Sequence, residues 1–498
     1  MVTATAKEYT MFVNGEWVPG NGGMMEIVNP ATEEVVHRVP RATKEDVDRA
    51  VAAAREAFDN GSWSNLSPAE RAGYLFKLAD IIESRIPELA RLETEETGKP
   101  ITLSRDADFP FGLDNLRYFA GASRVLEGQA TGEYVTTHTS MIRREPVGVI
   151  GQVAPWNYPF MMAIWKIGPA LAAGNTVVLK PAENTPATTL EIARAVEEAG
   201  FPRGVFNVIT GDEEAGVALT SHPDVDMVSL TGDSATGVKV MEQAAPTIKR
   251  LHLELGGKAP FVVFADADLE AAANCAAMAG TVNTGQDCTA ATRIYVERPV
   301  FDEFADRLVT ALKDVKVGDP LDEETAMGPL ISKEQLDRVE GFVDRAREAG
   351  IPVAIGGKRA DMQRGYYYEP TVVLNPPQDA EIVQREVFGP VLTVMPFDSE
   401  QEVLQKANGV DYGLAGSVWT SNVQRALNWA KKLNFGTVWI NDHMPIASEM
   451  PHGGFKRSGF GKDMSMYALE DYTRIKHVMA ELTGQAYKNV EPNEHEGV

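Results

Sequence analysis

A cysteine in a polar, glycine-containing segment has the clearest chemical potential in this sequence. Cys288 lies in the segment NTGQDCTA, between predicted helical residues and a predicted strand. A thiolate is the strongest side-chain nucleophile that a protein offers near neutral pH. The other role of a lone cysteine is that of a small buried hydrophobe, which suits Cys275 in the Ala-rich segment AAANCAAMAG. We therefore expect Cys288 to be functional and Cys275 to be a packing residue.

Two further polar side chains lie at the ends of predicted strands. Glu254 ends an apolar run and is followed by LGGK. A carboxylate buried there would have a raised pKa and suit a general base, or it would be a salt-bridged structural residue. Asn157 lies in the segment APWNYP after another strand, where ligands bind in open α/β sheets. Its amide is a neutral donor suited to an oxyanion, or it caps a turn between two prolines.

Short apolar runs separated by helical residues must position these side chains. The runs begin near residues 147, 176, 205, 227 and 251, and they do not alternate with polar residues. Such runs are typical of parallel strands that helices cover on both faces. A second α/β stretch follows from residue 259 to about 440. Residues 11–39 read as short antiparallel strands, and residues 43–119 as helices that include a capping box at Ser67.

Two segments fit neither α/β stretch. Residues 131–144 and 474–482 read as strands that pair with another element or with another subunit. The last residues are polar, and we expect them to be frayed. At ~150 residues per domain, the 498 residues correspond to about three domains.

Composition excludes several classes of protein. The net charge of −24 argues against nucleic-acid binding, which needs a basic surface. With 2 cysteines and no histidines at metal spacing, the chain has neither a disulfide scaffold nor a metal site. It has no signal-peptide pattern and no apolar run of ~18 residues, so we expect a cytoplasmic protein without a membrane segment.

The usual phosphate-binding signatures are absent from this chain. No G-x-G-x-x-G follows any of the predicted parallel strands, and no G-x-x-x-x-G-K-[ST] occurs. Either another arrangement of residues holds a nucleotide, or the sheet binds none.

The motifs together resemble the aldehyde dehydrogenase superfamily over nearly the whole chain. Besides the segments around Cys288, Glu254 and Asn157, the resemblance includes KPAENTP at 180–186, LTG at 230–232, EVFGP at 386–390, YGLA at 412–415 and PHGGFKRSG at 451–459. It implies an α/β fold with two Rossmann-like parallel-sheet domains and a small β oligomerisation arm. The expected ranges are 1–126 and 145–255 for the NAD-binding domain, 256–450 for the catalytic domain, and 127–144 and 474–490 for the arm. The family also implies a homo-oligomer, either a dimer or a tetramer.

The resemblance assigns a mechanism to the three chemical residues. Cys288 attacks the aldehyde carbonyl, and the Asn157 side chain and the Cys288 backbone N–H hold the thiohemiacetal oxyanion. Hydride leaves to the nicotinamide and produces a thioester, which water activated by Glu254 hydrolyses to a carboxylic acid. Covalent capture divides one difficult oxidation into two steps.

The family binds NAD(P) without the glycine fingerprint, which accounts for its absence here. By resemblance, Lys180 and Glu183 hold the adenine ribose, and Glu386 the nicotinamide ribose. A carboxylate at 183 accepts from a 2′-hydroxyl and repels a 2′-phosphate, which favours NAD, with NADP possible. Many members have Ser where this chain has Asp233, and an acid beside a pyrophosphate is unfavourable unless it points away or caps the next helix. The full set of expected cofactor-binding residues is Ala154, Pro155, Trp156, Lys180, Ala182, Glu183, Gly211, Gly232, Ser234, Leu255, Glu386 and Phe388.

The segments SEMPHGG, GKDMS and LEDYT are most similar to the aminoaldehyde branch, the 4-aminobutyraldehyde and betaine-aldehyde type. Carboxylates and aromatic rings would then face a substrate ammonium. Asp108 or Asp114, on the helix before Tyr118, could face the ammonium group. Alternatively, both are solvated charges on the surface of that helix. Asp463 matches a position that is often Glu and relays protons, a role that its shorter side chain leaves open. The expected substrate-binding residues are Asp287, Tyr158, Trp165 and Asp108.

Three other functions stay open at this stage. The chain could oxidise an uncharged aromatic or aliphatic aldehyde, or it could be a non-catalytic binding or structural descendant of the family. A cysteine hydrolase that pairs Cys288 with a histidine is the weakest alternative, because nothing in the sequence orients any of the 8 histidines toward Cys288.

Overall fold

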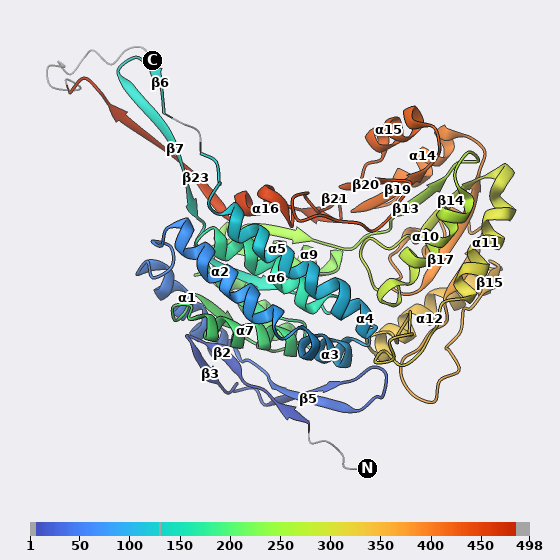
Figure 1. The fold of residues 1–498 in the computed structure, drawn as a ribbon, viewed down its shortest axis with the longest axis horizontal. Coiled ribbons are helices and arrows are strands. Elements are labelled where there is room, and N and C mark those ends of the chain that lie inside the picture. The colour runs from blue at the N-terminus through green and yellow to red at the C-terminus, as the bar shows by residue number, and fades with distance from the viewer. Residues whose placement is uncertain (1–5, 129–130, 485–498) are drawn as a thin grey trace.

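The structure is a computed structural model that describes residues 6–128 and 131–484. Its largest element is an eight-stranded sheet in the order β22-β12-β11-β8-β9-β10-β2-β3 (Figure 1). The strands from β12 to β10 run parallel, while β22 at one edge and β2 and β3 at the other are antiparallel. The bounds are β2 (Met11–Val13), β3 (Glu16–Val18), β8 (Val149–Val153), β9 (Thr176–Lys180), β10 (Phe206–Val208), β11 (Met227–Thr231), β12 (Arg250–Glu254) and β22 (Gly459–Phe460). The five apolar runs predicted as parallel strands are therefore confirmed.

Helices cover both faces of this sheet, which explains why its strands lack alternation. One apolar cluster joins the sheet to α2, α3, α5, α6 and α7, and another joins it to α1, α8 and α9. Every residue of α6 is buried, and all of them except Lys166 are apolar. Ser67 forms the predicted capping box at the start of α2. The bounds are α1 (Lys44–Asp59), α2 (Pro68–Glu83), α3 (Ile86–Thr97), α5 (Phe109–Ala122), α6 (Pro159–Ala172), α7 (Ala187–Ala199), α8 (Glu213–Ser221) and α9 (Ser234–Ala244).

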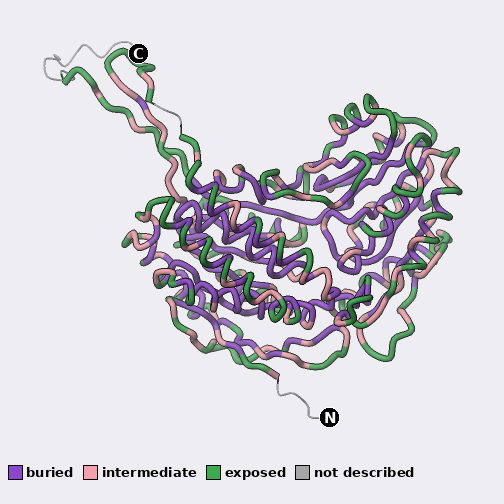
Figure 2. The backbone as a smooth tube through the Cα atoms, viewed as in Figure 1, coloured by how far each residue is buried: buried purple, intermediate pink, exposed green. Residues whose placement is uncertain are grey.

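A second sheet of seven strands has the order β15-β16-β17-β14-β13-β19-β20. Only β15 is antiparallel to its neighbour. Figure 2 shows the central strands of both sheets as buried backbone, whereas the edge strands are partly exposed. The strands are β13 (Pro260–Val263), β14 (Arg293–Glu297), β15 (Val353–Ile355), β16 (Thr371–Leu374), β17 (Val391–Phe397), β19 (Ala415–Trp419) and β20 (Thr437–Ile440); the helices are α10 (Leu269–Thr281), α11 (Phe301–Lys313), α12 (Lys333–Glu348), α13 (Glu381–Gln384), α14 (Glu400–Asn408) and α15 (Val423–Lys432).

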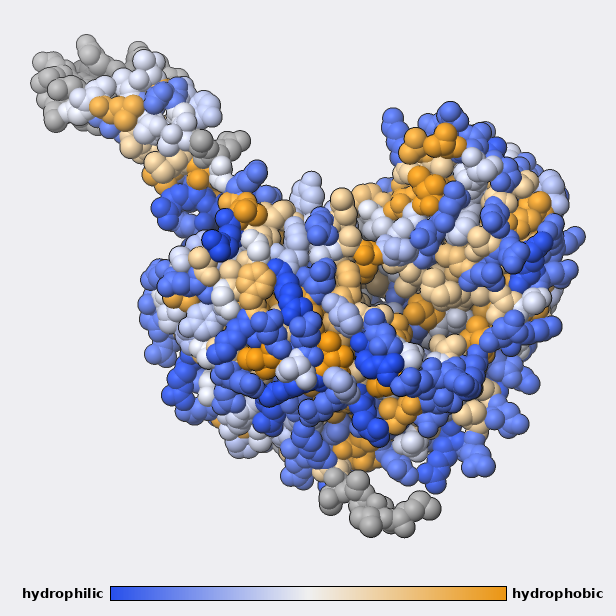
Figure 3. Space-filling view, in the orientation of Figure 1, coloured by the Kyte–Doolittle hydropathy of each residue, from blue (hydrophilic) through white to orange (hydrophobic). Residues whose placement is uncertain are grey.

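The two unassigned segments pair with each other. β6 (Gly132–Val135), β7 (His138–Pro146) and β23 (Thr473–Glu481) form an antiparallel sheet that projects from the body of the molecule (Figure 1). Hydrophobic atoms are visible on this arm in Figure 3, and Tyr134 and Ile475 are 80% and 64% exposed. Residues 129–130, and residues 485–490 at the end of the predicted arm segment, lie outside the described residues, as does most of the tail expected to be frayed.

Smaller elements complete the fold. β1 (Lys7–Glu8), β4 (Met24–Val28) and β5 (Val35–Pro40) form a three-stranded sheet in which β1 and β5 are parallel. β18 (Tyr412–Gly413) pairs with β21 (Phe455–Lys456), and α16 (Ser465–Asp471) precedes β23. Between α4 (Ile101–Leu103) and α5, residues Ser104–Asp108 form a π-helical turn. Within the described residues, no helix is long and apolar enough to cross a membrane.

Candidate active site

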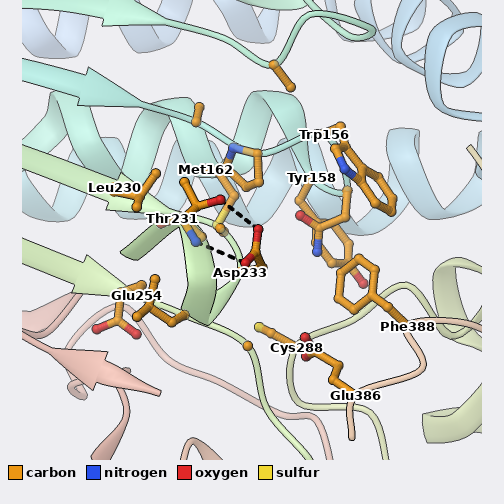
Figure 4. A pocket seen from close by; sticks show the side chains of 18 of the residues that line it. Trp156, Tyr158, Met162, Leu230, Thr231, Asp233, Glu254, Cys288, Glu386 and Phe388 are labelled. Carbon is orange, nitrogen blue, oxygen red and sulfur yellow. Dashed lines mark hydrogen bonds between the residues drawn. The ribbon is translucent and has the colours of Figure 1, made fainter. Parts of the chain in front are cut away.

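A single cavity of about 1450 Å³ brings the predicted site residues together. It follows the carboxyl ends of β8, β9, β11 and β12 and reaches the Cys288 loop and α12, as ligand sites do in open α/β sheets. Figure 4 shows its central part. Gly211 is the one predicted residue outside the lining, which its neighbours Asp212 and Glu213 join instead. The predicted residues in the lining are Asp108, Ala154, Pro155, Trp156, Asn157, Tyr158, Trp165, Lys180, Ala182, Glu183, Gly232, Ser234, Glu254, Leu255, Asp287, Cys288, Glu386 and Phe388.

The loop that carries Cys288 is held in a fixed backbone conformation. Asn283 and Thr284 have left-handed φ values of 49° and 60°, which side chains rarely adopt. The Gln286 side chain accepts a hydrogen bond from the Ile331 N–H at 2.9 Å and donates to the Asn283 carbonyl at 3.1 Å. A Cβ at Gly257 would lie 2.1 Å from the Cys288 carbonyl oxygen, so only glycine permits this approach. The thiol is therefore presented by a rigid loop.

Asn157 connects the first sheet to this loop. Its Nδ2 donates to the Gln286 carbonyl at 3.1 Å, and its backbone carbonyl accepts from Asn283 Nδ2 at 2.8 Å. The side chain makes no cap at the start of α6, where Tyr158 is the N-cap residue. An amide nitrogen carries two N–H donors, so one remains for a ligand beside Cys288.

The surroundings of Cys288 disfavour its ionised form in the protein alone. Burial raises the pKa of the thiol well above its usual value, and the carboxylates of Asp287, Glu386 and Glu254 raise it further. The Cys288 backbone N–H opposes this effect. A positive charge or a proton acceptor brought into the cavity would therefore activate the nucleophile.

Glu254 is a buried carboxyl group at the end of β12 without a salt bridge. Neither of its carboxyl oxygens has a hydrogen-bond partner. Burial and the Asp463 carboxylate raise its pKa well above the usual range, although His252 and Lys462 oppose the shift. In Figure 4 the carboxyl group and the Cys288 sulfur stand apart, with open cavity beside them. The group has the raised pKa expected of a general base.

The long part of the cavity has polar groups at both ends that suit a dinucleotide. At one end, Lys180 Nζ donates to the Pro181 carbonyl at 3.0 Å, and burial lowers its pKa to about 8. At the other end, Glu386 Oε1 accepts from the Gly257 N–H at 2.7 Å, and burial raises its pKa to about 7. A buried lysine and a buried carboxyl group can both hydrogen-bond to ribose hydroxyls. The donor set therefore fits the cofactor that the resemblance implies.

Asp233, where many family members have Ser, lies in the part of the cavity expected to hold the pyrophosphate. Asp233 Oδ1 accepts from the N–H groups of Ala235 at 2.7 Å and Thr236 at 3.0 Å, and so caps α9. Burial raises the pKa of Asp233, but these hydrogen bonds together lower it by more, so the pKa lies below its usual value. The Ser234 hydroxyl donates to the Arg457 carbonyl at 2.8 Å. The acid is thus a helix cap, the role in which it is tolerable beside a pyrophosphate.

The substrate end is more internally bonded than we expected. Asp287 Oδ2 accepts from the Tyr158 hydroxyl at 2.7 Å, and Oδ1 accepts from the Thr289 N–H and hydroxyl, both at 2.6 Å. Asp108 is not a solvated helix-face charge: it is buried and lies 2.6 Å from Lys99 Nζ. Asp114 accepts from the Ser448 hydroxyl at 2.6 Å. Asp108 and Asp287 still line the cavity, but each already has partners.

Several lining residues were not predicted from the sequence. His452 is buried against Trp165, with ring centroids 5.4 Å apart, and neither Trp165 Nε1 nor His452 Nδ1 has a partner. Arg338 on α12 donates to the Glu386 carbonyl at 2.6 Å. The motif PHGG was a signal for His452, whereas nothing around Arg338 distinguishes it from other polar residues of an amphipathic helix. Among the described residues, no group of three or more His, Cys, Asp or Glu could hold a metal ion.

Comparison with known proteins adds an independent finding. The model of the aldehyde dehydrogenase family matches residues 17–478. The betaine aldehyde dehydrogenase of Bacillus subtilis is 43% identical over 488 residues, which are 97% of this chain and 98% of that protein. An aldehyde dehydrogenase of Emericella nidulans is 44% identical over 94% of both chains.

Solved structures agree with this match in fold. The NAD⁺ complex of the aldehyde dehydrogenase from Bacillus cereus gives a TM-score of 0.94 at 45% identity and covers 96% of this chain and 97% of that chain. The betaine aldehyde dehydrogenase from Staphylococcus aureus in complex with NAD⁺ gives 0.94 at 41% identity, with 97% of each chain covered. With the cysteine loop, the buried glutamate and the dinucleotide-sized cavity in one place, this chain belongs to the aldehyde dehydrogenase family.

Proposed function

We propose that this enzyme oxidises an aldehyde to a carboxylic acid with NAD, through an acyl intermediate on Cys288. The observation that carries the proposal is that Cys288, Asn157 and Glu254 line the same cavity as Lys180 and Glu386. Two solved relatives that share more than 40% of their residues with this chain are NAD⁺ complexes.

The proposed reaction divides into two steps at Cys288. The sulfur bonds to the aldehyde carbon, the π bond of the carbonyl breaks, and the thiol proton passes to solvent water. Asn157 Nδ2 and the Cys288 N–H donate to the resulting oxyanion. Bound NAD⁺ supplies the acceptor for the hydride, two electrons and one hydrogen, that the carbon loses. The thioester that remains on Cys288 then takes up water, its C–S bond breaks, and Glu254 receives one proton of that water.

For the cofactor we propose NAD over NADP. Glu183 lies in the cavity lining three residues after Lys180, and its carboxylate would repel a 2′-phosphate. Comparing kcat/KM for NAD and NADP tests this proposal. Glu183→Gln should lower the ratio of kcat/KM with NAD to kcat/KM with NADP, because it removes the charge that repels the 2′-phosphate. Equal kcat/KM values for the two cofactors in the unmodified enzyme would contradict the proposal.

For the substrate we propose an aminoaldehyde such as 4-aminobutyraldehyde. Trp165 and Phe111 give the substrate end aromatic faces, and Asp287 places a carboxyl group in its wall. Tyr158 and Asp108 line the same end, where Lys99 Nζ already lies 4.1 Å from the centroid of the Tyr158 ring and 2.6 Å from Asp108. Relatives of nearly equal identity are named betaine aldehyde dehydrogenase and aldehyde dehydrogenase, so overall identity does not separate substrates.

A substrate panel tests the class and the preference together. NADH formation is followed with 4-aminobutyraldehyde, betaine aldehyde, and uncharged aliphatic and aromatic aldehydes of similar length. Higher kcat/KM for the cationic aldehydes supports the preference, and equal kcat/KM values for cationic and uncharged aldehydes would contradict it. Turnover of no aldehyde would leave the non-catalytic descendant as the better account.

We also propose that the enzyme is a homo-oligomer, a dimer or a tetramer, assembled through the arm of β6, β7 and β23. The exposed apolar side chains on a projecting three-stranded sheet support this. A cytoplasmic location follows from the mechanism, because Cys288 must stay reduced, and both cysteines are free thiols.

A further inference from the structure

A row of titratable side chains leads from Glu254 toward the molecular surface. His252 and Glu254 are two residues apart on β12, so their side chains leave the same face of the strand. His252 is completely buried, and nothing in the proposed reaction uses it.

Each ring nitrogen of His252 lies at ion-pair distance from a carboxylate, although neither nitrogen has a hydrogen-bond partner. Nε2 lies 3.2 Å from Asp463 Oδ1, and Nδ1 lies 3.3 Å from Asp471 Oδ2. The ring stacks on Tyr472 with centroids 6.0 Å apart. A Cβ at Gly461 would lie 2.6 Å from Nδ1, so the backbone at Gly461 closes the remaining side of the ring.

The two carboxylates differ in their access to water. Asp463 is 1% exposed and lines the active-site cavity, where it raises the pKa of Glu254. The Asp471 side chain, at the end of α16, is 42% exposed. His252 is therefore the buried link between a group at the active site and a group in contact with solvent.

Two lysines lie near these titratable side chains and interact electrostatically with their carboxyl groups. Lys166 Nζ donates to the Ser229 hydroxyl at 3.1 Å and acts on both Glu254 and Asp463. Lys462 Nζ donates to the Gly453 carbonyl at 2.6 Å and acts on Glu254 and Asp471. Burial alone would lower the pKa of His252, but Asp463 and Asp471 raise it to about 9. A protonated imidazole can donate a proton from one ring nitrogen and accept a new proton at its second ring nitrogen.

The chemistry at Cys288 needs such a path. Glu254 receives one proton from water in each turnover and must lose it before the next, yet it is buried without a hydrogen-bond partner. We propose that His252 conducts this proton from the side of Glu254 and Asp463 to Asp471, and so to solvent. This inference rests on the proposed function, because it needs a hydrolysed acyl intermediate. His252 acts through Glu254 and is in this sense a positioning and proton-transfer residue.

The test separates the first oxidation from the turnovers that follow it. Rapid mixing of enzyme with excess NAD and aldehyde gives a burst of NADH for the first oxidation, and chemical quenching at later times gives the steady rate of acid formation, which requires Glu254 to lose its proton before each new turnover. Asp471→Asn should leave the NADH burst unchanged and slow the steady rate of acid formation roughly tenfold in dilute buffer. A high concentration of a small buffer base should restore the rate, because the lost group is half-exposed and buffer can replace it.

Glu470→Gln is the matched control, since it neutralises the adjacent carboxylate, which pairs with Arg144 instead of His252. His252→Gln is a second variant, expected to slow acid formation at least as much, with no rescue by buffer because the site is buried. Unchanged acid formation in both Asp471→Asn and His252→Gln would overturn the inference. Equal loss of burst and acid formation would assign His252 and Asp471 a purely structural role. Absence of any NADH formation by the unmodified enzyme would instead refute the proposed function.

Discussion

At the scale of residues, the nucleophile is held firmly but is not activated by its own surroundings. The half-buried Cys288 thiol lies in a site where desolvation and the carboxyl groups of Asp287, Glu386 and Glu254 keep its pKa high. Its reactivity must come from what enters the cavity, and an oxidised nicotinamide carries the positive charge that would serve. The enzyme without cofactor should therefore be slow to react with thiol reagents.

The amide of Asn157 provides a direct test of the oxyanion donor. Asn157→Ala should lower kcat/KM by about 10²–10³-fold, because one N–H is removed from the developing negative charge. Steady-state kinetics measures this, and Asn184→Ala is a control, since Asn184 lines the same cavity after β9. Similar losses in the two variants would contradict a specific role for Asn157.

The raised pKa of Glu254 predicts the direction of a pH effect. Only the ionised carboxylate can accept a proton from water, so acid formation should fall as pH decreases through this raised pKa. The limb should lie well above the pH at which an exposed glutamate titrates, because burial and Asp463 disfavour ionisation. Rate constants of acid formation measured against pH test this. A profile that is unchanged in Glu254→Gln would assign the limb to another group.

At the scale of elements, the sequence was most informative where regular patterns decide the structure. The non-alternating runs predicted the parallel strands β8 to β12, and the Ser67 motif predicted the start of α2. The strand ends, and with them Asn157 and Glu254, followed from that pattern. β22 could not be predicted, because a two-residue strand at a sheet edge has no periodicity of its own.

Asp108 shows why the substrate end was harder to predict. It is the last residue of the π-helical turn Ser104–Asp108, which was not predicted from the sequence, and it lies buried beside Lys99. A buried lysine needs carboxylates around it, and Glu93 lies 3.3 Å away on its other side. Such a buried cluster depends on three segments meeting in space, which no local pattern reveals.

This cluster predicts a large loss of stability. Lys99→Met should lower the free energy of unfolding by roughly 3–5 kcal/mol, because it leaves Glu93 and Asp108 buried without their cation. Lys44→Met removes an exposed pair with Asp48 and should cost less than about 1 kcal/mol. Urea unfolding measures both. Equal effects of the two substitutions would mean that the buried cluster contributes no more than a surface ion pair.

At the scale of the whole molecule, the net charge of −24 affects which ligands approach the protein, and the projecting arm offers a surface for another subunit. The negative field favours approach of cationic aldehydes and disfavours the anionic cofactor, so Lys180 and the backbone amides at the strand ends must offset it locally. The two large sheets share one cavity, whereas the arm stands away from it (Figure 1).

The arm gives a prediction about assembly. Ile475 on β23 is 64% exposed, and Ile475→Glu would place a charge on a face that we expect another subunit to cover. The variant should have a smaller mass than the unmodified protein in light scattering, with its secondary structure retained. Val423→Glu makes a comparable change on α15, where Val423 is 61% exposed, and should leave the mass unchanged. An unchanged mass in Ile475→Glu would place the interface elsewhere.

The acyl intermediate on Cys288 is the most direct test of the account as a whole. Glu254→Gln is mixed with NAD and an aldehyde that the unmodified enzyme oxidises, quenched in acid, and analysed by peptide mass spectrometry. We predict that the peptide containing Cys288 gains the mass of the acyl group in stoichiometric amount while NADH is formed, and that the peptide containing Cys275 does not. Formation of NADH and acid with no acyl group on Cys288 at any time would contradict the account.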